Sequence, residues 1–237
     1  MTAKNELVKL MESLGRYSDE ALEKLEKYME GILSWNGHVN LTNITYPDDF
    51  INKHYIDSLL LGQCQEFLEG KRIIDVGTGG GFPGIPLAIL YPEKEFVLLD
   101  SLKKRLKIID ELCQEIKISN VTTYHGRAED AGKEKSMRES FDVCVSRAVA
   151  NLSTLCELCI PLVKKGGNFI AYKGPAVNDE LKEAKKAIKI LGGKITRVEF
   201  PMGQKDLEHA FAIIEKIADT PGKYPRKAGD PSKKPIR

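Results

Sequence analysis

A carboxylate followed by a cluster of glycines is the part of the sequence best suited to hold a ligand. Asp75 stands near the end of a short apolar run, and four glycines lie within the five residues 77–81. An apolar segment, 85–90, follows Pro83 and predicts a helix. Strand, glycine turn and helix in this order are typical of the first nucleotide-binding unit of an α/β sheet. Because a turn needs only one or two glycines, the cluster predicts that a bulky ligand approaches the backbone here.

Two ligand classes are compatible with these glycines. The segment 79–84 matches the G-x-G-x-x-G pattern of dinucleotide binders, and 75–81 matches the acid-x-G-x-G-x-G pattern of S-adenosylmethionine binders. Asp75 favours the second class, because a carboxylate repels an anionic pyrophosphate and attracts a sulfonium or an ammonium. Pro83 agrees, since it removes an amide donor that a phosphate binder would use. We therefore predict S-adenosylmethionine as the cofactor, with Asp100 at the end of the second strand accepting from the ribose hydroxyls.

The loop after the third predicted strand is expected to border the adenine. Glu129 or Asp130 is suited to accept a hydrogen bond from the ring amine, and the backbone of Ala128 and Glu129 to frame the ring. A solvated acidic loop is the alternative, which the rest of the pattern disfavours.

Arg147 follows the fourth predicted strand. In methyltransferases that use S-adenosylmethionine, the target base normally meets the methyl donor at this place. At the carboxyl edge of a central strand, this side chain is expected to point into the ligand crevice. A buried ion pair with Asp57, Asp75 or Glu129 remains the alternative. We assign no catalytic acid or base, and Arg147 is the closest candidate for a catalytic residue.

Several groups that other methyltransferases need are missing near this position. The Asn/Asp-Pro-Pro-aromatic turn of exocyclic-amine enzymes is absent, and Cys144 lies mid-strand, where a packed thiol is inert. No evident general base is present. A purine N7 lone pair needs no deprotonation and attacks a methyl group directly in line, so that positioning and electrostatics would carry catalysis.

The elements that must position these residues alternate along the chain from Lys71 onward. The predicted strands are 73–76, 96–100, 121–125, 141–146, 168–172, 194–200 and 210–214, and the helices between them 85–90, 102–116, 152–163 and 179–191. This alternation predicts a mainly parallel sheet covered on both faces. Only 201–208 separates the last two strands, so they should pair antiparallel. Such a seven-stranded sheet resembles the Rossmann-like class I S-adenosylmethionine-dependent methyltransferases.

The segments before and after this α/β unit differ from it in pattern. Residues 1–66 form a predicted helical extension, with helices over 18–33, capped by Ser18 or Asp19, and over 47–67. The methyltransferase unit is expected to cover 67–217. Residues 218–237 are predicted to form a basic, proline-rich tail.

The tail is the main candidate for contact with RNA. Residues 221–237 contain six Lys or Arg against one acid, and their four prolines argue against a regular helix, so we expect an extended or, when alone, disordered strap. Deleting it should weaken RNA binding far more than cofactor binding. A second basic cluster opens the helix 102–116, where a solvated surface is an equal alternative. The predicted RNA-binding residues are Lys103, Arg105, Lys173, Lys223, Arg226, Lys227, Lys233 and Lys234.

The composition of the chain limits which partners and cellular compartments are compatible with it. The chain has 237 residues, 42% of them hydrophobic, and a net charge of +2, so an RNA footprint must come from the distribution of charge. No apolar run reaches the ~18 residues that span a bilayer, and the N-terminus lacks a signal-peptide pattern. We therefore expect a cytoplasmic monomer with no membrane partner. Five irregularly spaced cysteines predict free thiols in a reducing compartment and no metal site.

The whole series of motifs resembles the bacterial small-subunit ribosomal RNA guanine-N7 methyltransferase G family, also called glucose-inhibited division protein B. The resemblance rests on Trp35-Asn36, Asn40-Leu41-Thr42, His54, Asp57-Ser58-Leu59, the loop 75–86, Asp100-Ser101, Lys103-Lys104-Arg105, 126–129, Ser146-Arg147-Ala148-Val149, Lys173-Gly174 and the tail motif 223–226 with Gly229, Pro231 and Pro235. It implies methylation of N7 of one guanine in small-subunit (16S) ribosomal RNA, with the RNA or the small ribosomal subunit as partner.

The resemblance also implies cofactor contacts. They are Gly77, Phe82, Ala128, Glu129 and Arg147, to which the residue chemistry adds Asp75, Gly79 and Asp100. Alternatives remain: a methyltransferase acting on another RNA, a protein or a small molecule; a nicotinamide-dependent dehydrogenase; and a non-catalytic RNA-binding module. The intact loop and Asp75 disfavour the last two. The roles of His54 and Asp57 stay open, with a brace between helix and sheet preferred.

Overall fold

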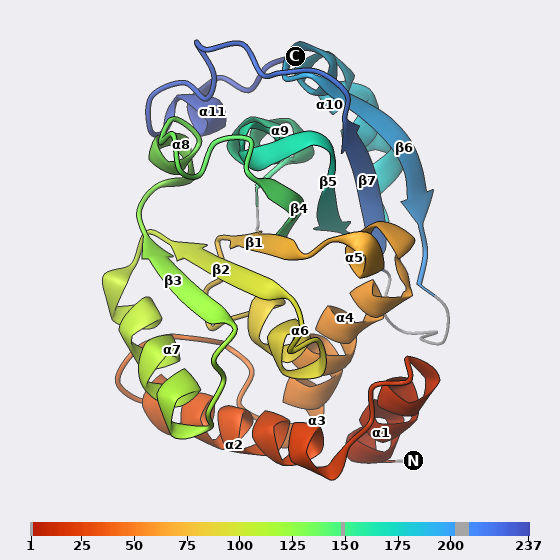
Figure 1. Cartoon of the computed structure of the whole chain (residues 1–237), viewed down its shortest axis with the longest axis vertical. Coiled ribbons are helices and arrows are strands. Elements are labelled where there is room, and N and C mark those ends of the chain that lie inside the picture. The colour runs from red at the N-terminus through yellow and green to blue at the C-terminus, as the bar shows by residue number, and fades with distance from the viewer. Residues whose placement is uncertain (1, 148–149, 202–208) are drawn as a thin grey trace.

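A seven-stranded sheet organises the computed structural model, which describes residues 2–147, 150–201 and 209–237 (Figure 1). The strands lie in the order β3-β2-β1-β4-β5-β7-β6. They are β1 (Arg72–Val76), β2 (Glu95–Asp100), β3 (Val121–His125), β4 (Phe141–Ser146), β5 (Val163–Lys173), β6 (Gly193–Glu199) and β7 (Ala210–Lys216). Strands β1 to β5 are parallel, whereas β7 runs antiparallel to both β5 and β6. The predicted sheet, with its antiparallel final hairpin, is confirmed.

Helices cover both faces of this sheet. They are α6 (Gly84–Leu90), α7 (Lys103–Glu115), α8 (Ala128–Ala131), α9 (Leu152–Cys159) with the 3-10 turn η3 (Ile160–Leu162), and α10 (Val177–Ile190). In Figure 1, α6 and α7 lie on one side of the sheet and α9 and α10 on the other. The strand order reverses between β1 and β4, which is the point where an open α/β sheet binds its ligands.

Two hydrophobic clusters follow from the alternation of side chains along each strand. Ile73 and Ile213 belong to one cluster, with the N-terminal helices, α6 and α7. Their neighbours Ile74 and Ile214 belong to the other cluster, with α9 and α10. Successive strand residues point to opposite faces, so a sheet buried on both sides needs continuous apolar runs such as these.

The N-terminal segment packs into the first cluster. It begins with α1 (Ala3–Ser13) and α2 (Asp19–Asn36), and Leu25, Tyr28 and Ile32 form the buried stripe of α2. The predicted cap is present, since the Ser18 side chain accepts a hydrogen bond of 3.1 Å from the Ala21 amide. The helical extension therefore shares its core with the sheet.

The predicted single helix over 47–67 is wrong in detail. The chain forms α3 (Pro47–Phe50), the π-helix η1 (Ile51–Ile56), α4 (Asp57–Leu59), the 3-10 helix η2 (Leu60–Gln63) and α5 (Gln65–Glu69). Residues 55–62 are all buried. The segment therefore has no single apolar face, and packing on all of its sides sets the path of the backbone. Cys64 is extended and separates η2 from α5.

The C-terminal segment is also more ordered than expected. It runs beside α8 and α9 at one end of the molecule (Figure 1) and includes a short helix, α11 (Asp230–Lys233). Pro231 stands in the first turn of α11, where its missing N–H costs nothing, and it is buried. The expectation that the prolines exclude a regular helix is thus wrong for this turn.

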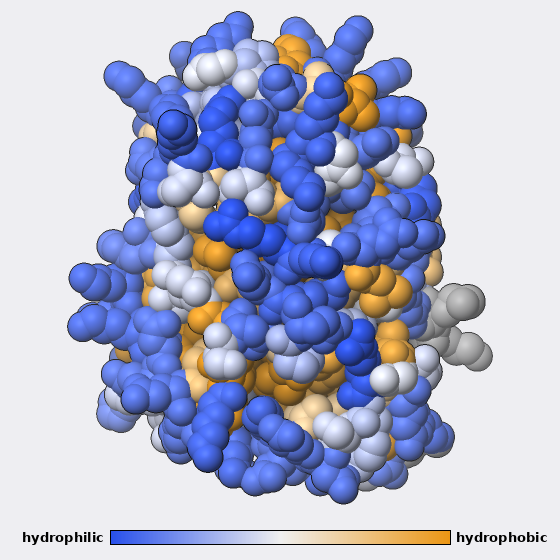
Figure 2. All heavy atoms as spheres, in the orientation of Figure 1, coloured by the Kyte–Doolittle hydropathy of each residue, from blue (hydrophilic) through white to orange (hydrophobic). Residues whose placement is uncertain are grey.

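The surface is largely hydrophilic on the face shown in Figure 2, where apolar side chains are visible mainly between polar ones. Within the described parts of the chain, no helix has the length and apolar character needed to cross a membrane. All five cysteines are buried and free.

Candidate cofactor site

The glycine loop lies at the carboxyl end of β1 and is tied to the end of β2. The amides of Gly77 and Thr78 both donate to the Leu99 carbonyl, at 2.9 and 3.1 Å, and the Gly79 amide donates to Asp100 Oδ2 at 2.9 Å. Gly79 has a φ of +59°, and a Cβ on it would meet nothing within 4 Å. At Gly79 the loop thus presents bare backbone to open space, as a site for a bulky ligand requires.

Helix α2 supports this loop from behind. The buried hydroxyl of Tyr28 donates to the Gly80 carbonyl at 2.9 Å. Gly81 has a φ of +88°, and a Cβ there would collide with the same hydroxyl. The sequence did not reveal this role, because Tyr28 fits the apolar stripe of α2 and reads as an ordinary core residue.

Asp75 is fully buried beneath the loop. Its Oδ2 accepts from the Thr78 hydroxyl at 2.7 Å and from the Gly84 amide at 3.0 Å. Its Oδ1 has no hydrogen-bond partner among the described residues. Burial raises the pKa of Asp75 to about 6, against the lowering effect of the two hydrogen bonds. A buried carboxylate oxygen without a partner suits a cationic ligand.

Asp100 and Glu129 lie beside the loop but also hold protein groups. Asp100 accepts the Gly79 amide with Oδ2 and the Leu102 amide with Oδ1, at 2.9 and 2.8 Å. Glu129 is 7% exposed, follows Ala128 at the start of α8, and accepts the Gly229 amide with Oε1 at 2.9 Å. Each oxygen retains a second lone pair for a ligand hydroxyl or amine.

Arg147 forms the ion pair that was held open as the alternative. Its Nη1 lies 2.7 Å from Asp57 Oδ2 and donates to the Lys53 carbonyl at 2.9 Å. Its Nη2 lies 3.0 Å from His54 Nδ1, and its guanidinium lies 5.5 Å from the centre of the Phe82 ring. Arg147 therefore braces the end of β4 against η1 and α4. The adjoining Ala148 and Val149 of the predicted motif lie outside the described residues.

His54 is a neutral member of this cluster. Burial, then the nearby Arg147 charge, lowers its pKa to about 3. Since Arg147 only donates, His54 Nδ1 accepts, and Nε2 carries the proton toward Thr42 Oγ1 at 2.7 Å. The imidazole also stacks on Phe82, with ring centres 4.2 Å apart. Stacking on His54 thus fixes the ring of Phe82, which directly follows the glycines of the loop.

Asp57 has a second partner, His209, which sequence reasoning missed. His209 Nδ1 lies 2.5 Å from Asp57 Oδ1, and the hydrogen bond to Asp57 raises the pKa of His209. Asp57 is 1% exposed; burial opposes its ionisation, but His209 and Arg147 outweigh this effect and lower its pKa. These contacts support a bracing role for Asp57 and His54.

The predicted RNA-binding residues fall into two groups. Lys103, Lys223, Lys227, Lys233 and Lys234 are exposed. Arg105 donates to the Asn40 carbonyl at 3.2 Å, and Lys173 pairs with Glu180 at 2.7 Å.

Arg226 was predicted to contact RNA, but its Nη2 lies 2.5 Å from an oxygen of the buried Glu157 carboxylate. Sequence could not reveal this pair, because 69 residues separate its members.

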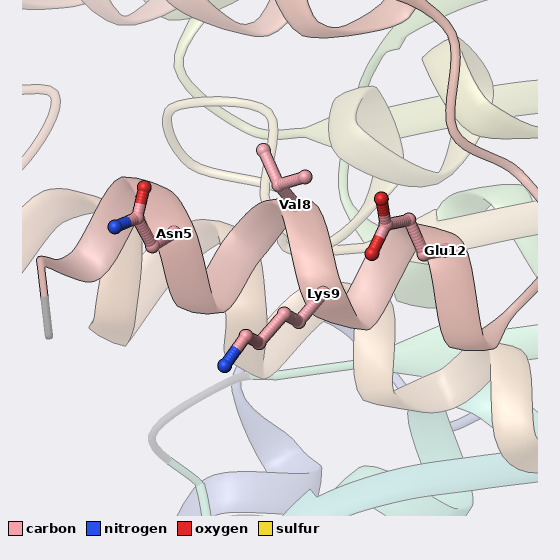
Figure 3. A pocket seen from close by; sticks show the side chains of 4 residues that line it. All are labelled: Asn5, Val8, Lys9 and Glu12. Carbon is pink, nitrogen blue, oxygen red and sulfur yellow. The ribbon is translucent and has the colours of Figure 1, made fainter.

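Three hollows lined by described residues are candidates for ligands. One of about 360 Å³ lies next to Asp100, and its lining is Val39, Asn40, Ser101, Leu102, Lys103, Lys104 and Arg105. A second follows β2 and β3 near Tyr124. The third is a groove along α1 whose side chains all come from that one helix (Figure 3). The described residues contain no group of three or more His, Cys, Asp or Glu placed to hold a metal.

Comparisons with known proteins agree with this geometry. The family model GidB, described as rRNA small subunit methyltransferase G, matches residues 21–208. Ribosomal RNA small subunit methyltransferase G of Clostridium novyi (strain NT) is 50% identical over 221 residues, covering 93% of this chain and 91% of that protein. Its counterpart in Clostridium tetani (strain Massachusetts / E88) is 51% identical over 212 residues, 89% of each chain.

Solved structures share the architecture at much lower identity. An O-methyltransferase from Bacillus cereus in complex with SAH has a TM-score of 0.56 and 20% identity, covering 80% of this chain and 90% of that one. A putative O-methyltransferase from Klebsiella pneumoniae has a TM-score of 0.53 and 16% identity, with 89% and 95% covered. The fold is that of class I S-adenosylmethionine-dependent methyltransferases, and the chain belongs to the rRNA small subunit methyltransferase G family.

Proposed function

We propose that this chain transfers a methyl group from S-adenosylmethionine to N7 of a specific guanine in small-subunit (16S) ribosomal RNA. Family membership supports the coarser part of this statement, a methyltransferase of small-subunit ribosomal RNA that uses S-adenosylmethionine. The choice of N7 rests on the side chains around the crevice and on the family resemblance.

The observation that carries the proposal is the buried Asp75 with its unpartnered oxygen beside open glycine backbone. Such a carboxylate favours a ligand with positive charge and disfavours a pyrophosphate. S-adenosylmethionine, when bound, supplies an activated methyl group on a sulfonium centre. We expect Asp75 to hold its ammonium, Asp100 its ribose, and the Ala128–Glu129 segment its adenine, with Gly77, Gly79 and Phe82 lining the loop.

Among the described residues of the crevice, neither His54 nor Asp57 is free to act as a general base. His54 uses one ring nitrogen for Arg147 and the other for Thr42. Asp57 is paired with both Arg147 and His209. An amine or hydroxyl target would need a group that removes a proton, whereas N7 of guanine attacks with a lone pair. Positioning of the guanine in line with the methyl group then carries catalysis, and Arg147 remains the closest candidate for a catalytic residue.

The exposed cations around the site are suited to an RNA backbone. Lys103 lines the hollow next to Asp100, and Lys223, Lys227, Lys233 and Lys234 are exposed along the C-terminal segment. Phosphate contacts of this kind supply affinity that falls with salt. The partner we propose is the ribosomal RNA itself or the small subunit, bound by a monomer.

Mapping the modified nucleotide tests the proposal. Small subunits from cells lacking this protein are incubated with the enzyme and labelled S-adenosylmethionine. The RNA is then reduced with borohydride and cleaved with aniline, a treatment that breaks the chain at 7-methylguanosine. We expect one cleavage site, absent with a Gly77→Asp variant. Labelled RNA that resists cleavage would place the methyl group elsewhere, and labelled protein would favour the alternative substrate class.

A further inference from the structure

The C-terminal segment is clamped onto α8 and α9. The Arg226 amide and Nε both donate to Glu157 Oε1 at 2.8 Å, and the Glu157 side chain is only 1% exposed. Further along, Thr154 Oγ1 donates to the Pro231 carbonyl at 3.0 Å and Ser153 Oγ to the Ile236 carbonyl at 2.5 Å. A segment held by a buried ion pair and several hydrogen bonds is part of the folded structure.

One contact joins this segment to the adenine side of the site. The Gly229 amide donates to Glu129 Oε1 at 2.9 Å, a contact in which Glu129 Oε2 takes no part. Gly229 has a φ of +87°, a conformation that side chains other than glycine adopt at a cost, and a Cβ on it would meet nothing within 4 Å. The backbone conformation, and not crowding, therefore makes glycine necessary here.

We propose that the C-terminal segment is a positioning element of the cofactor site, in which the Gly229 amide fixes the Glu129 carboxylate so that its second oxygen accepts the adenine amine. The ion pair between Arg226 and Glu157 sets the path of the segment. The hydrogen bond from Gly229 to Glu129 then links the position of the segment to that of α8. Binding of the cofactor and docking of the segment are then coupled, and each strengthens the other. The inference rests on the proposed contact between Glu129 and the adenine.

The consequence for the tail differs from the expectation drawn from sequence. Removing 221–237 takes away the partners of Glu157, Thr154 and Glu129 together. We therefore expect loss of cofactor affinity as well as of any RNA affinity. A deletion cannot separate the two roles, so point substitutions are needed.

Calorimetry with two ligands tests the positioning role in the full chain. S-adenosylhomocysteine carries the ring amine, and S-inosylhomocysteine replaces it with a carbonyl. We expect the unmodified protein to prefer the first by about tenfold or more. Gly229→Ala should lose most of this preference, because its strained backbone shifts the amide. Gly229→Asn should retain it, since asparagine tolerates this conformation better.

Two controls make the outcome decisive. Gly222→Ala lies in the same segment, where a Cβ also meets nothing within 4 Å and no positive φ is present, and it should keep the full preference. Glu129→Gln should abolish it. A Gly229→Ala protein that keeps the ratio, or that loses affinity equally for both ligands, overturns the positioning role. If Glu129→Gln keeps the ratio, the adenine contact itself is wrong, although methylation of RNA by the unmodified protein can still stand.

Protection from protease gives a second readout that needs no variant. Trypsin cleavage after the exposed Lys227 requires the segment to leave its site, so saturating S-adenosylhomocysteine should slow that cut severalfold. Cleavage after the exposed Lys4, near the start of α1, serves as the reference in the same digest. Equal rates at Lys227 with and without the ligand would show that the segment and the cofactor are not coupled.

Discussion

Replacing Asp75 by asparagine should make the free protein more stable and a poorer binder of its cofactor. The pKa of Asp75 is raised from 3.8 to about 6 by burial, so at pH 8 the folded protein holds a carboxylate charge that it disfavours. A shift of about two units corresponds to roughly 3 kcal/mol of lost unfolding free energy. The asparagine oxygen still accepts from Thr78 and Gly84, but its buried amide needs a partner, which costs about 1 to 2 kcal/mol.

The net gain is therefore about 1 to 2 kcal/mol at pH 8, or about 2 to 8 °C in Tm. Because the folded pKa lies above the unfolded one, the cost of ionised Asp75 develops as the pH rises from about 4 to 6. The stability difference between the two proteins should thus be small near pH 4 and reach its plateau above pH 6. Thermal unfolding at a series of pH values measures it.

Cofactor affinity should change in the opposite direction. The ammonium of S-adenosylhomocysteine loses a charged partner, which costs about 1.5 to 3 kcal/mol, or roughly 10- to 100-fold in Kd. Asp142→Asn is a matched control. Burial opposes ionisation of Asp142, but Lys164 and the amides of Arg72 and Lys71 outweigh it and lower its pKa, so asparagine there should destabilise the protein at pH 8. Affinity for the ligand should be unchanged in that control.

A destabilised Asp75→Asn protein with unchanged affinity would refute this reasoning. It would mean that Asp75 serves the loop alone, and that the unpartnered oxygen is not a ligand site. Stability and affinity both falling would point to general damage. Only a gain in stability together with a loss of ligand affinity agrees with a carboxylate that serves to bind a cationic ligand.

Three further changes probe the supports of the site. Tyr28→Phe, which removes the hydrogen bond under the glycine loop, should cost about 1 kcal/mol of unfolding free energy and weaken S-adenosylhomocysteine binding in calorimetry. Asp57→Asn should return the pKa of His209 toward 6.5 in NMR titrations. The variant should also be less stable than the unmodified protein, and this difference should shrink as the pH rises through the pKa that His209 has in the unmodified protein. Lys233→Gln with Lys234→Gln should lower the salt dependence of RNA binding by about one unit of log–log slope per lost contact and leave the ligand Kd unchanged.

The sequence predicted well what depends on local pattern. The alternation of strand and helix patterns located all seven strands, although β3 and β6 are not continuous apolar runs, and the short connection 201–208 predicted the antiparallel hairpin. The acid-glycine pattern located the loop at β1, because backbone conformation and ligand charge constrain residue types over a few neighbouring positions.

It predicted poorly what depends on distant partners. Asp57 pairs with His209, 152 residues away, and Glu157 pairs with Arg226 across 69 residues. The sequence of a basic segment does not show whether a lysine or arginine in it faces solvent or pairs with a buried acid. Only the fold decides between the two: Arg226 forms an ion pair with the buried Glu157, and its contact with RNA stays a prediction.

The two ends of the chain support the cofactor site from opposite faces of the sheet. Tyr28 on α2 holds the glycine loop from the face that carries α6 and α7. Gly229 in the C-terminal segment holds Glu129 from the face that carries α8 and α9. A ligand at the carboxyl edge between these supports contacts groups fixed by both ends, although neither end belongs to the sheet. We therefore expect the extension and the tail, which look like additions to an α/β unit in the sequence, to hold the loop and Glu129 in place before the ligand binds, so that little binding energy is lost in ordering them.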